Sequence, residues 1–447
     1  MADQNYTPPV WIGLDVGTQG ARALVVAAGG AVVGRGAAPL SGSRDGPRHE
    51  QDPRHWWEAV AAASRAALRD VAPERVRGVA TCATSGTVLL VDRDGEPLTP
   101  GLMYDDARAS AQAARATIAL GRPVAASSGL AKLWWMLDAW PQLAGRGRLA
   151  HQADVVTRRL VGRDVPSDCG HALKSGYDVE REAWPALGVP DGLLPDVVRG
   201  GTPLGEVCAK AAAQTAIPAG TPVVAGMTDG CAAQFAAGAL RDGDWNAVLG
   251  TTLVLKGCSR RLVRDPTGVL YSHRAPGGRW LPGGASSAGA GVLAAGFAGR
   301  DLDELGARAT AFEQTSVLAY PLVSRGERFP FAAPDAEPFV LGEPADEAEC
   351  FAALLHGVAF VERLCFDYLD LLGLPTAGEL TLTGGATRSR YWCQLRADVL
   401  GRPVRLVEQA EAAFGMAILA AAGDRDLATV AGEMVHTRAV VDPRPDR

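Results

Sequence analysis

One pattern occurs twice in this chain of 447 residues and limits its possible folds more than any other feature. Apolar runs flank Gly17-Thr18 on both sides, and another pair of apolar runs flanks Gly250-Thr251-Thr252. Short apolar runs joined by a glycine-containing turn predict a β-hairpin. One hairpin near the start of each half of the chain predicts a duplicated lobe. We therefore expect a first domain over residues 1–240 and a second over residues 241–447.

The rest of the chain alternates between apolar runs and helical periodicity, which predicts α/β lobes. Asp52-Pro53 is typical of an N-cap followed by the first residue of a helix. The stretch 185–222 is rich in Gly and Pro, and we expect it to be irregular. Strands are expected at 10–15, 21–27, 31–34, 76–80, 88–91, 222–226, 245–249, 253–256 and 380–383. Helices are expected from residue 53 onward and at 112–120, 133–139, 154–160, 231–240, 362–372, 389–400 and 411–422.

The charge balance argues against several classes of partner. The chain carries 44 Lys and Arg against 50 Asp and Glu, a formal net charge of −6. A mildly acidic protein is poorly suited to non-specific binding of nucleic acid or anionic membranes, so we expect neither. The N-terminal residues contain no apolar signal region, and the apolar run 412–422 is too short to span a bilayer. We expect a cytoplasmic monomer or homodimer.

The eight cysteines and seven histidines show no spacing that predicts a metal site. The cysteines are scattered and contain no C-x-x-C pair. This usage is typical of reduced, mostly buried thiols rather than of a disulfide framework. We therefore do not expect a zinc enzyme.

The two Gly-Thr turns are candidate phosphate-binding sites. Glycine lets the backbone approach an anion closely, and consecutive N–H groups in a turn form an anion-binding concavity. Either turn alone could use Gly and Thr for purely local reasons. The matched pair favours a grip on both ends of a triphosphate, as in ATP.

Asp229 is a candidate general base. It follows the apolar run 222–226, and Gly226 and Gly230 flank it, so its carboxylate can project from a tight loop. A positioned base that takes a proton from an attacking hydroxyl contributes about 10²–10⁴ in rate. The alternative is a structural role, either in an Asx-turn or as the N-cap of the helix that follows.

Two further positions have both a functional and a structural interpretation. Asp15, at the end of an expected strand, could hold Mg²⁺, which binds through one or two carboxylates and several waters; otherwise it is a turn former. Gly384-Gly385, after the strand 380–383, could let a flat ring lie against the backbone, or could form an ordinary strand-to-helix turn. Trp56-Trp57 and Trp134-Trp135 could stack on a sugar, although paired tryptophans at helical positions favour core packing.

Other nucleotide-binding motifs are absent from the sequence. It contains no G-x-x-x-x-G-K-[ST], no protein-kinase motif set, and no G-x-G-x-x-G between a strand and a helix. A P-loop ATPase, a protein kinase and a Rossmann dehydrogenase are therefore disfavoured.

Several motifs taken together resemble those of the FGGY family of carbohydrate kinases, in order and spacing, over nearly the whole chain. The most specific is the C-terminal motif GGATRSRYWCQLRADVLGRPV, whereas the first is shared in outline by all actin-like ATPases. The motifs are LDVGTQGARALVV (14–26), HEQDPRHWW (49–57), MYDDARA (103–109), GMTDG (226–230), GTT (250–252) and the motif just quoted (384–404).

The resemblance implies two ribonuclease H-like lobes of the actin/Hsp70 ATPase type, with ATP and sugar in a cleft between them. It implies that Asp229 is the general base and that Asp15 helps to hold Mg²⁺ through water. It also implies a set of nucleotide contacts. These are Thr18, Gln19 and Arg22 at the first hairpin, Gly250, Thr251 and Thr252 at the second, and Gly384, Gly385, Arg388 and Ser389 around the adenosine.

Departures from the typical xylulokinase motifs bear on the sugar. This chain has Ser85-Gly86 in place of Met-His and Asp229-Gly230 in place of Asp-Asn, and both places are sugar contacts in that group. Tyr104 replaces the Trp of the W-x-D-x-R motif, in which Asp106 and Arg108 are kept. The resemblance thus implies Ser85, Asp106, Asp229 and Gly230 as sugar-binding residues.

These features are similar to those of a short branch of D-ribulose kinases. We therefore expect a ketopentose kinase whose preferred substrate is D-ribulose, with D-xylulose as the second candidate. A protein of another class with the same hairpins remains the alternative, namely a chaperone-like ATPase or a sugar-responsive switch that hydrolyses nucleotide without phosphorylating sugar.

Overall fold

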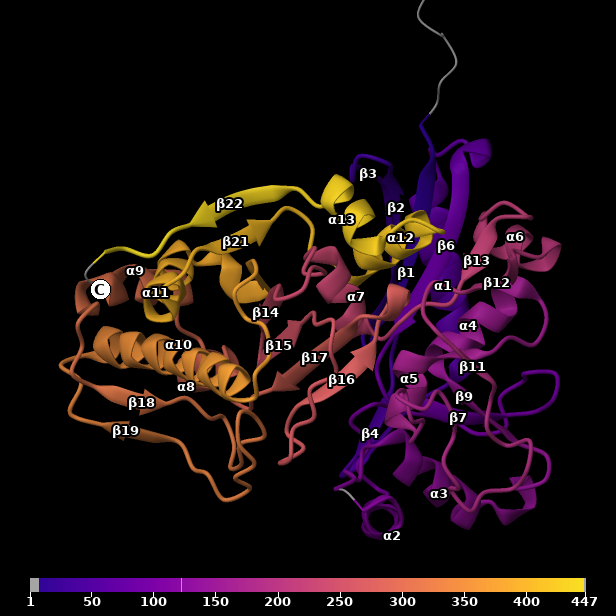
Figure 1. The fold of residues 1–447 in the computed structure, drawn as a ribbon, viewed down its shortest axis with the longest axis horizontal. Coiled ribbons are helices and arrows are strands. Elements are labelled where there is room, and N and C mark those ends of the chain that lie inside the picture. Colours follow the sequence, from indigo (N-terminus) through magenta and orange to yellow (C-terminus); the bar gives the residue numbers. More distant parts are fainter. Residues whose placement is uncertain (1–7, 122, 446–447) are drawn as a thin grey trace, which may run out of the picture. The chain divides into compact units, whose positions relative to one another are not determined.

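The computed structural model describes residues 8–121 and 123–445, which form two structural units (Figure 1). The first unit contains residues 8–236, 273–278 and 411–434, and the second contains residues 237–272, 279–410 and 435–445. The sequence predicts no signal region at the N-terminus. This prediction concerns in part residues 1–7, which lie outside the described residues. Within the described residues, no helix combines the length and the apolar character needed to cross a membrane.

A six-stranded mixed sheet forms the core of the first unit. β1 and β2 form the predicted antiparallel hairpin, while β6 runs parallel to β1 and β13 runs parallel to β6. In spatial order the strands are β12 (Pro203–Glu206), β13 (Pro222–Val224), β6 (Val76–Ala83), β1 (Val10–Val16), β2 (Gly20–Ala27) and β3 (Val32–Pro39).

Smaller elements complete the first unit. Asp52 caps α1 as expected, because its carboxylate accepts a hydrogen bond from the Arg54 N–H at 2.9 Å. A five-stranded sheet contains β4 (Ser43–Asp45), β5 (Arg48–Gln51), β8 (Gly101–Leu102), β7 (Val88–Val91) and β9 (Arg148–His151), and β10 (Ser167–Asp168) pairs with β11 (Val197–Val198). The helices are α1 (Pro53–Leu68), α2 (Ser110–Leu120), α3 (Gly129–Ala139), α4 (Gln152–Val161), α5 (Cys169–Lys174), α6 (Ala209–Thr215), α7 (Asp229–Ala236), α12 (Ala412–Ala422) and α13 (Leu427–Met434).

The helix α12 packs in the first unit although it lies near the end of the sequence (yellow in Figure 1). Two glycines permit this packing. A Cβ at Gly13 on β1 would lie 1.7 Å from the Ala413 carbonyl oxygen, and a Cβ at Gly415 would lie 1.9 Å from the Ala232 carbonyl oxygen of α7. The predicted domain boundary at residue 240 stays a prediction. A single boundary there would assign α12 to the second domain, whereas α12 packs in the first unit.

The second unit repeats the strand order of the first. β14 (Trp245–Leu249) and β15 (Leu253–Gly257) form the second predicted hairpin, and β20 (Leu380–Thr383) and β21 (Val404–Val407) run parallel to β14. The order β22-β21-β20-β14-β15-β17 therefore corresponds to β12-β13-β6-β1-β2-β3. The remaining strands are β16 (Tyr271–Arg274), β17 (Trp280–Ala285), β18 (Leu318–Tyr320), β19 (Phe339–Leu341) and β22 (Thr437–Val441), and the helices are α8 (Gly291–Gly296), α9 (Leu302–Ala309), α10 (Glu347–Leu371) and α11 (Arg390–Leu400).

One sequence expectation about local structure is wrong, and another covers only part of its element. The stretch 185–222 is not irregular throughout, because it contains β11, β12 and α6. The helix expected at 362–372 begins 15 residues earlier, at Glu347. Residues 351–359 of α10 are all buried, so they show no alternation of polar and apolar faces from which a helix could be predicted.

A buried ion pair joins α10 to α11. The Arg396 guanidinium donates to both carboxylate oxygens of Glu362, at 2.6 and 2.8 Å, and both side chains are at most 1% exposed. Removing one partner leaves the other charge buried without a counter-ion. We expect Glu362→Gln to lower the free energy of unfolding by about 3–5 kcal/mol, measured by thermal and urea denaturation.

The same helix offers a matched control. Asp367 pairs with Arg363 at 2.8 Å, but both side chains are about half exposed. We expect Asp367→Asn to change the free energy of unfolding by less than about 0.5 kcal/mol, because solvent screens an exposed pair. Equal effects of the two substitutions would contradict the role assigned to burial.

Candidate active site

The candidate catalytic residues of the first unit lie at one edge of its sheet. Asp15 is the sixth residue of β1 and pairs in register with Cys82 of β6, and Ala83 forms a parallel bridge with Thr228. Ser85 follows β6 by two residues, and Asp229 follows Thr228. Since neighbouring parallel strands end at the same edge, the chain brings Asp15, Ser85 and Asp229 together there.

Asp229 is the first residue of α7 and is half-buried. One carboxylate oxygen accepts a hydrogen bond from the Gly230 N–H at 2.7 Å. Burial is the largest cause that raises the pKa of Asp15 and of Tyr104, which is 45% exposed, and the charge of Asp229 adds to the rise at both groups. Asp229 is therefore a carboxylate with access to solvent, close to both of these groups.

Asp15 is buried, and its surroundings oppose ionisation. Burial and the nearby charge of Asp229 raise the pKa of Asp15 to about 6, against the lowering effect of Arg22. Arg22 Nη1 lies 3.3 Å from one carboxylate oxygen, and the Cys82 thiol donates to the other at 3.7 Å. Two carboxylates that repel each other fit a divalent cation, because the cation would remove the repulsion.

Asp15 could act as a ligand of the kind that Mg²⁺ uses. Among residues 8–121 and 123–445, no group of three or more His, Cys, Asp and Glu side chains is spaced to hold a metal ion. A protein site for Mg²⁺ needs only one or two carboxylates, since the ion keeps several waters. The donor set therefore fits hydrated Mg²⁺ better than a metal enclosed by protein ligands.

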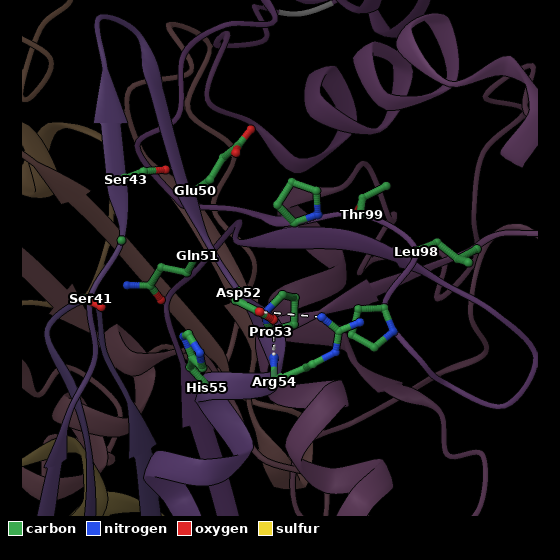
Figure 2. A pocket seen from close by; sticks show the side chains of 13 residues that line it. Ser41, Ser43, Glu50, Gln51, Asp52, Pro53, Arg54, His55, Leu98 and Thr99 are labelled. Carbon is green, nitrogen blue, oxygen red and sulfur yellow. Dashed lines mark hydrogen bonds and ion pairs between the residues drawn. The ribbon is translucent and has the colours of Figure 1, made fainter.

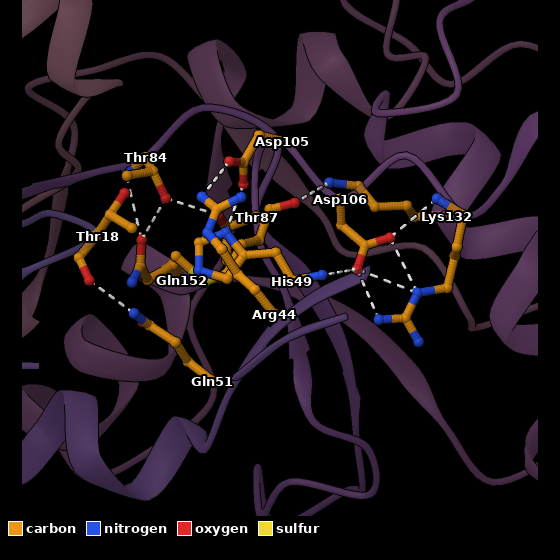
Figure 3. Close-up of polar contacts among 12 residues, drawn as sticks. Thr18, Arg44, His49, Gln51, Thr84, Thr87, Asp105, Asp106, Lys132 and Gln152 are labelled. Atoms are coloured by element: carbon orange, nitrogen blue, oxygen red, sulfur yellow. Dashed lines mark hydrogen bonds and ion pairs between the residues drawn. The ribbon is translucent and has the colours of Figure 1, made fainter. Parts of the chain in front are cut away.

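The first hairpin turn spans residues 17–20. The Gly17 N–H donates to the Gly20 carbonyl at 3.0 Å, and the side chain of Gln51 donates to the Thr18 carbonyl at 2.7 Å. Thr18 is half-buried and Gln19 is exposed. Gln51 thus fixes the backbone of the turn from β5 (Figure 3).

The second hairpin turn is held within the second unit by a run of small residues. The Ala290 and Gly291 N–H groups donate to the Gly250 and Thr251 carbonyls, at 2.9 and 3.1 Å. A Cβ at Gly289 would lie 2.5 Å from both the Thr251 carbonyl oxygen and the Thr252 Cα. The backbone of 288–291 therefore lies directly against the turn.

Gly384 packs against the strand that leads into this turn. Its φ of +90° favours glycine, and a Cβ there would lie 2.5 Å from the Leu249 carbonyl oxygen. Gly385 and Arg388 are exposed, while Ser389 caps α11 by accepting a hydrogen bond from the Trp392 N–H at 3.2 Å. The predicted nucleotide residues of the second unit thus adjoin the ends of β14 and β20.

The turn that carries Ser85 is held by Gln152 at the start of α4. The side-chain oxygen of Gln152, Oε1, accepts from the Thr84 N–H at 3.2 Å and from the Thr84 hydroxyl at 2.6 Å (Figure 3). Gly86 has a φ of +94°. The Ser85 hydroxyl oxygen is buried and has no hydrogen-bond partner among the described residues. Ser85 therefore offers an unused hydroxyl.

Asp106 lies beside this region but is fully buried, and both of its carboxylate oxygens accept hydrogen bonds within the protein. The donors are the Arg108 side chain, at 2.6–3.1 Å, and the His49 N–H at 2.7 Å. Lys132 donates to the Met103 carbonyl at 2.7 Å, and burial lowers its pKa to about 7. These contacts fix the chain on either side of Tyr104, whereas a direct sugar contact by Asp106 stays a prediction (Figure 3).

A surface pocket of about 520 Å³ lies near α1 but contains none of the predicted site residues. Its lining includes Gln51, Asp52, Arg54 and Leu98 (Figure 2). Gln51 links it to the first hairpin through the hydrogen bond to the Thr18 carbonyl. The tryptophans Trp56 and Trp57 next to it are at most 5% exposed, which favours core packing over sugar stacking.

Two residues that hold the site have no role predicted from the sequence. Gln152 contacts a segment distant in the sequence, so no local pattern identifies it, whereas Gln51 lies within the motif HEQDPRHWW, which was a usable indication. The alternating small residues of SSAGAG (286–291) were a usable indication, because repeated glycines predict a close backbone approach.

Comparison with solved structures defines the class of protein. The fold matches a "xyloylose kinase" from Brucella ovis with a TM-score of 0.89 and 26% identity, covering 97% of this chain and 95% of that one. It matches a xylulose kinase from Rhodospirillum rubrum with a TM-score of 0.86 and 28% identity, covering 97% and 94%. The predicted two-domain α/β fold of the actin/Hsp70 ATPase type is confirmed.

The family follows from the sequence. Residues 10–236 match the N-terminal domain of the FGGY family of carbohydrate kinases, and residues 245–423 match its C-terminal domain. A xylulose kinase from Streptomyces coelicolor is 33% identical over 443 residues, covering 92% of this chain and 88% of that protein. The chain belongs to the FGGY family of carbohydrate kinases, which phosphorylate sugars with ATP.

Proposed function

We propose that this protein transfers the terminal phosphoryl group of ATP to the terminal hydroxyl of a ketopentose, with Asp229 as the general base. The favoured reaction converts D-ribulose to D-ribulose 5-phosphate. The observation that carries the proposal is the position of Asp229, a half-buried carboxylate at the sheet edge that also carries Asp15 and Ser85.

The proposed chemistry needs few groups. Asp229 accepts the proton of the sugar hydroxyl as the hydroxyl oxygen bonds to the γ-phosphorus and the bond to the ADP oxygen breaks. Bound Mg²⁺, held by Asp15 through water, would neutralise charge on the phosphates. The rest of the catalysis is positioning, in which the protein holds the hydroxyl oxygen in line with the phosphorus.

We assign the nucleotide to the two hairpins. Backbone N–H groups at Thr18 and Gln19, with Arg22, would contact phosphate oxygens in the first unit. In the second unit Gly250, Thr251 and Thr252 would do so, and Gly384, Gly385, Arg388 and Ser389 would flank the adenosine. The exposure of Gln19, Thr251 and Arg388 supports contact with a ligand.

We assign the acceptor sugar from two residues that the family resemblance places at the sugar. Ser85, with an unused hydroxyl, and Gly230 stand where typical xylulokinases have larger residues, which favours D-ribulose. D-Xylulose is the second candidate, because the S. coelicolor relative and the R. rubrum structure are both named xylulose kinases. We propose that the protein binds small molecules only, and neither nucleic acid nor membranes. We also propose that it is a cytoplasmic monomer or homodimer.

A panel of sugars tests the acceptor. We expect kcat/KM for D-ribulose to exceed that for D-xylulose by about 10-fold or more, and glycerol to be poorer still, in a coupled assay of ADP release. We expect Ser85→Ala to raise KM for the preferred ketose by about 10-fold, the cost of a lost substrate hydrogen bond.

The outcomes separate the candidate functions. A preference for D-xylulose would transfer the activity to that sugar and contradict the assignment of D-ribulose. ADP release that no sugar stimulates would support the nucleotide-dependent switch. Ser43→Ala, on the exposed strand β4, is the matched control for Ser85→Ala and should leave KM for the ketose unchanged.

A further inference from the structure

A buried ion pair lies behind the sheet edge that carries Ser85 and Asp229. The Asp168 carboxylate uses one oxygen to cap α5, accepting from the Gly170 and His171 N–H groups at 2.9 and 3.0 Å. Its other oxygen lies 2.6 Å from His171 Nδ1. His171 is fully buried and Asp168 is 4% exposed. The sugar and nucleotide residues assigned above do not include this pair.

The second nitrogen of the His171 ring points at the end of β6. His171 Nε2 lies 3.2 Å from the Ala83 carbonyl oxygen, two residues before Ser85. Burial opposes the imidazolium, but the charges of Asp168 and Asp154 and the hydrogen bonds to Asp168 and Ala83 raise the pKa of His171 to about 9. At neutral pH both ring nitrogens are therefore donors, one toward Asp168 and one toward Ala83.

The other charged and titratable groups that face His171 are compatible with this state. The ring of His151 lies 6.0 Å away, centroid to centroid, and its Nδ1 contacts the Asp154 carboxylate at 2.9 Å. His151 Nε2 lies 3.0 Å from the Ser175 hydroxyl. Asp154 thus contacts the His151 ring, and its negative charge also acts on the His171 imidazolium.

The same short helix contacts the segment that leads to Asp229. A Cβ at Gly170 would lie 3.3 Å from the Met227 methyl carbon and 3.6 Å from the Thr228 methyl carbon. The capped first turn of α5 therefore packs on the two residues that precede Asp229. The Asp168–His171 pair and the first turn of α5 thus contact both the backbone before Ser85 and the residues before Asp229.

We infer that Asp168 and His171 are positioning residues, which set the distance between the Ser85 turn and the Asp229 loop through the hydrogen bond from His171 Nε2 to the Ala83 carbonyl. The inference rests on the proposed function, because that function assigns the sugar to Ser85 and Asp229. The consequence is a specific one: loss of this bond should impair use of the sugar and spare use of the nucleotide.

Hydrogen exchange tests the positioning without any assay of activity. We expect His171→Leu to speed amide exchange by roughly tenfold or more in peptides covering residues 83–87, with no change over residues 10–20. His356→Leu is the matched control, since His356 is a buried histidine of the second unit whose Nδ1 contacts the Ala352 carbonyl at 2.9 Å. Unchanged exchange over residues 83–87 in His171→Leu overturns the inference.

Steady-state kinetics test the consequence for the sugar. We expect His171→Leu to lower kcat/KM for the preferred ketopentose by about 10- to 100-fold, as for a small misplacement of reacting groups, and to leave KM for ATP within about twofold. A smaller folded fraction would lower the apparent kcat/KM and leave every KM unchanged, so each rate is divided by the fraction of the protein that binds ATP. A normalised kcat/KM for the ketopentose equal to that of the parent overturns the inference.

A double variant with two uncharged side chains tests the inference even if His171→Leu does not fold. In Asp168→Asn/His171→Gln the asparagine oxygen can still cap α5, and the glutamine amide can still donate to Ala83. Replacing both members of a buried pair costs far less than removing one. We expect this double variant to keep near-normal exchange over residues 83–87 and kcat/KM within about threefold of the parent. Fast exchange in the folded double variant overturns the role of the Ala83 bond.

Failure of the proposed function is distinguishable from failure of this inference. If the parent protein phosphorylates no ketopentose, the proposed function is wrong, while the exchange result still decides whether His171 holds the Ser85 turn. If the parent is an active ketopentose kinase and His171→Leu matches it in exchange and kinetics, only the inference is wrong.

Discussion

Asp229→Asn is expected to lower kcat for ketopentose phosphorylation by at least about 10²–10⁴-fold, the usual contribution of a positioned general base. Asparagine keeps nearly the same volume and can still accept the hydrogen bond from the Gly230 N–H, but it cannot take a proton from the sugar hydroxyl. We therefore expect the loss to fall on kcat, with the affinity for ATP within about threefold of the parent.

The comparison with Asp229→Ala separates catalysis from helix stabilisation. Asp229 begins α7, where a negative charge stabilises the helix by about 0.3–1 kcal/mol. If that were its only role, both variants would be slightly less stable than the parent and would keep its activity. Asp191→Asn, on an exposed loop of the same unit, is the control. Turnover by Asp229→Asn at the parental rate would remove Asp229 from the mechanism.

The fold could be predicted from the sequence where its determinants are local. The hairpin turns at Gly17-Thr18 and Gly250-Thr251 lie where they were expected, because glycine turns and short apolar runs depend on neighbouring residues. The parallel strands β6 and β20 are also at the predicted places. The correspondence of the two sheets then follows from hairpins of the same kind.

What could not be predicted depends on contacts between distant segments. The close approach of α12 to β1 depends on Gly13, because any side chain there would clash with the Ala413 backbone. Nothing near Gly13 in the sequence indicates that Ala413 packs against it. Likewise, His171 is an isolated histidine in the sequence, and only the fold brings its ring to the Ala83 carbonyl. Roles carried by single long-range hydrogen bonds leave no periodic pattern.

Asp15 and Asp229 lie at the same sheet edge of the first unit. The family motifs imply roles for Asp15 and Asp229 one residue at a time, without saying why two carboxylates should be close. The structure supplies a physical reason: burial and the repulsion from Asp229 together raise the pKa of Asp15, and a nearby divalent cation would favour the ionised form of both carboxylates. A site that is unfavourable without its cation makes a prediction about stability as well as about activity.

Asp15→Asn is expected to stabilise the metal-free protein at neutral pH while lowering kcat by about 10²–10³-fold. The pKa of Asp15 is about 6 in the folded protein, above its ordinary value of 3.8. Between these values the folded state binds more protons than the unfolded state, so the Asp15 contribution to stability falls as the pH rises from about 4 to about 6. Above pH 6 the ionised carboxylate costs roughly 1–3 kcal/mol. Asparagine removes that cost, and its single side-chain oxygen can still accept from Arg22 while its NH2 group faces the Cys82 sulfur.

Thermal unfolding across pH, without divalent cations, measures this effect. The unfolding temperature of Asp15→Asn should exceed that of the parent by a few degrees at pH 7.5, and the difference should shrink toward zero near pH 4, where Asp15 is protonated in the parent too. Asp45→Asn, at an exposed position of β4, should show no such trend. Addition of Mg²⁺ with ATP should then stabilise the parent more than the variant. Only the parent retains the Asp15 carboxylate, whose repulsion from Asp229 the cation would reduce. A variant that is less stable than the parent at pH 7.5 would show that the Arg22 and Cys82 contacts outweigh the repulsion from Asp229.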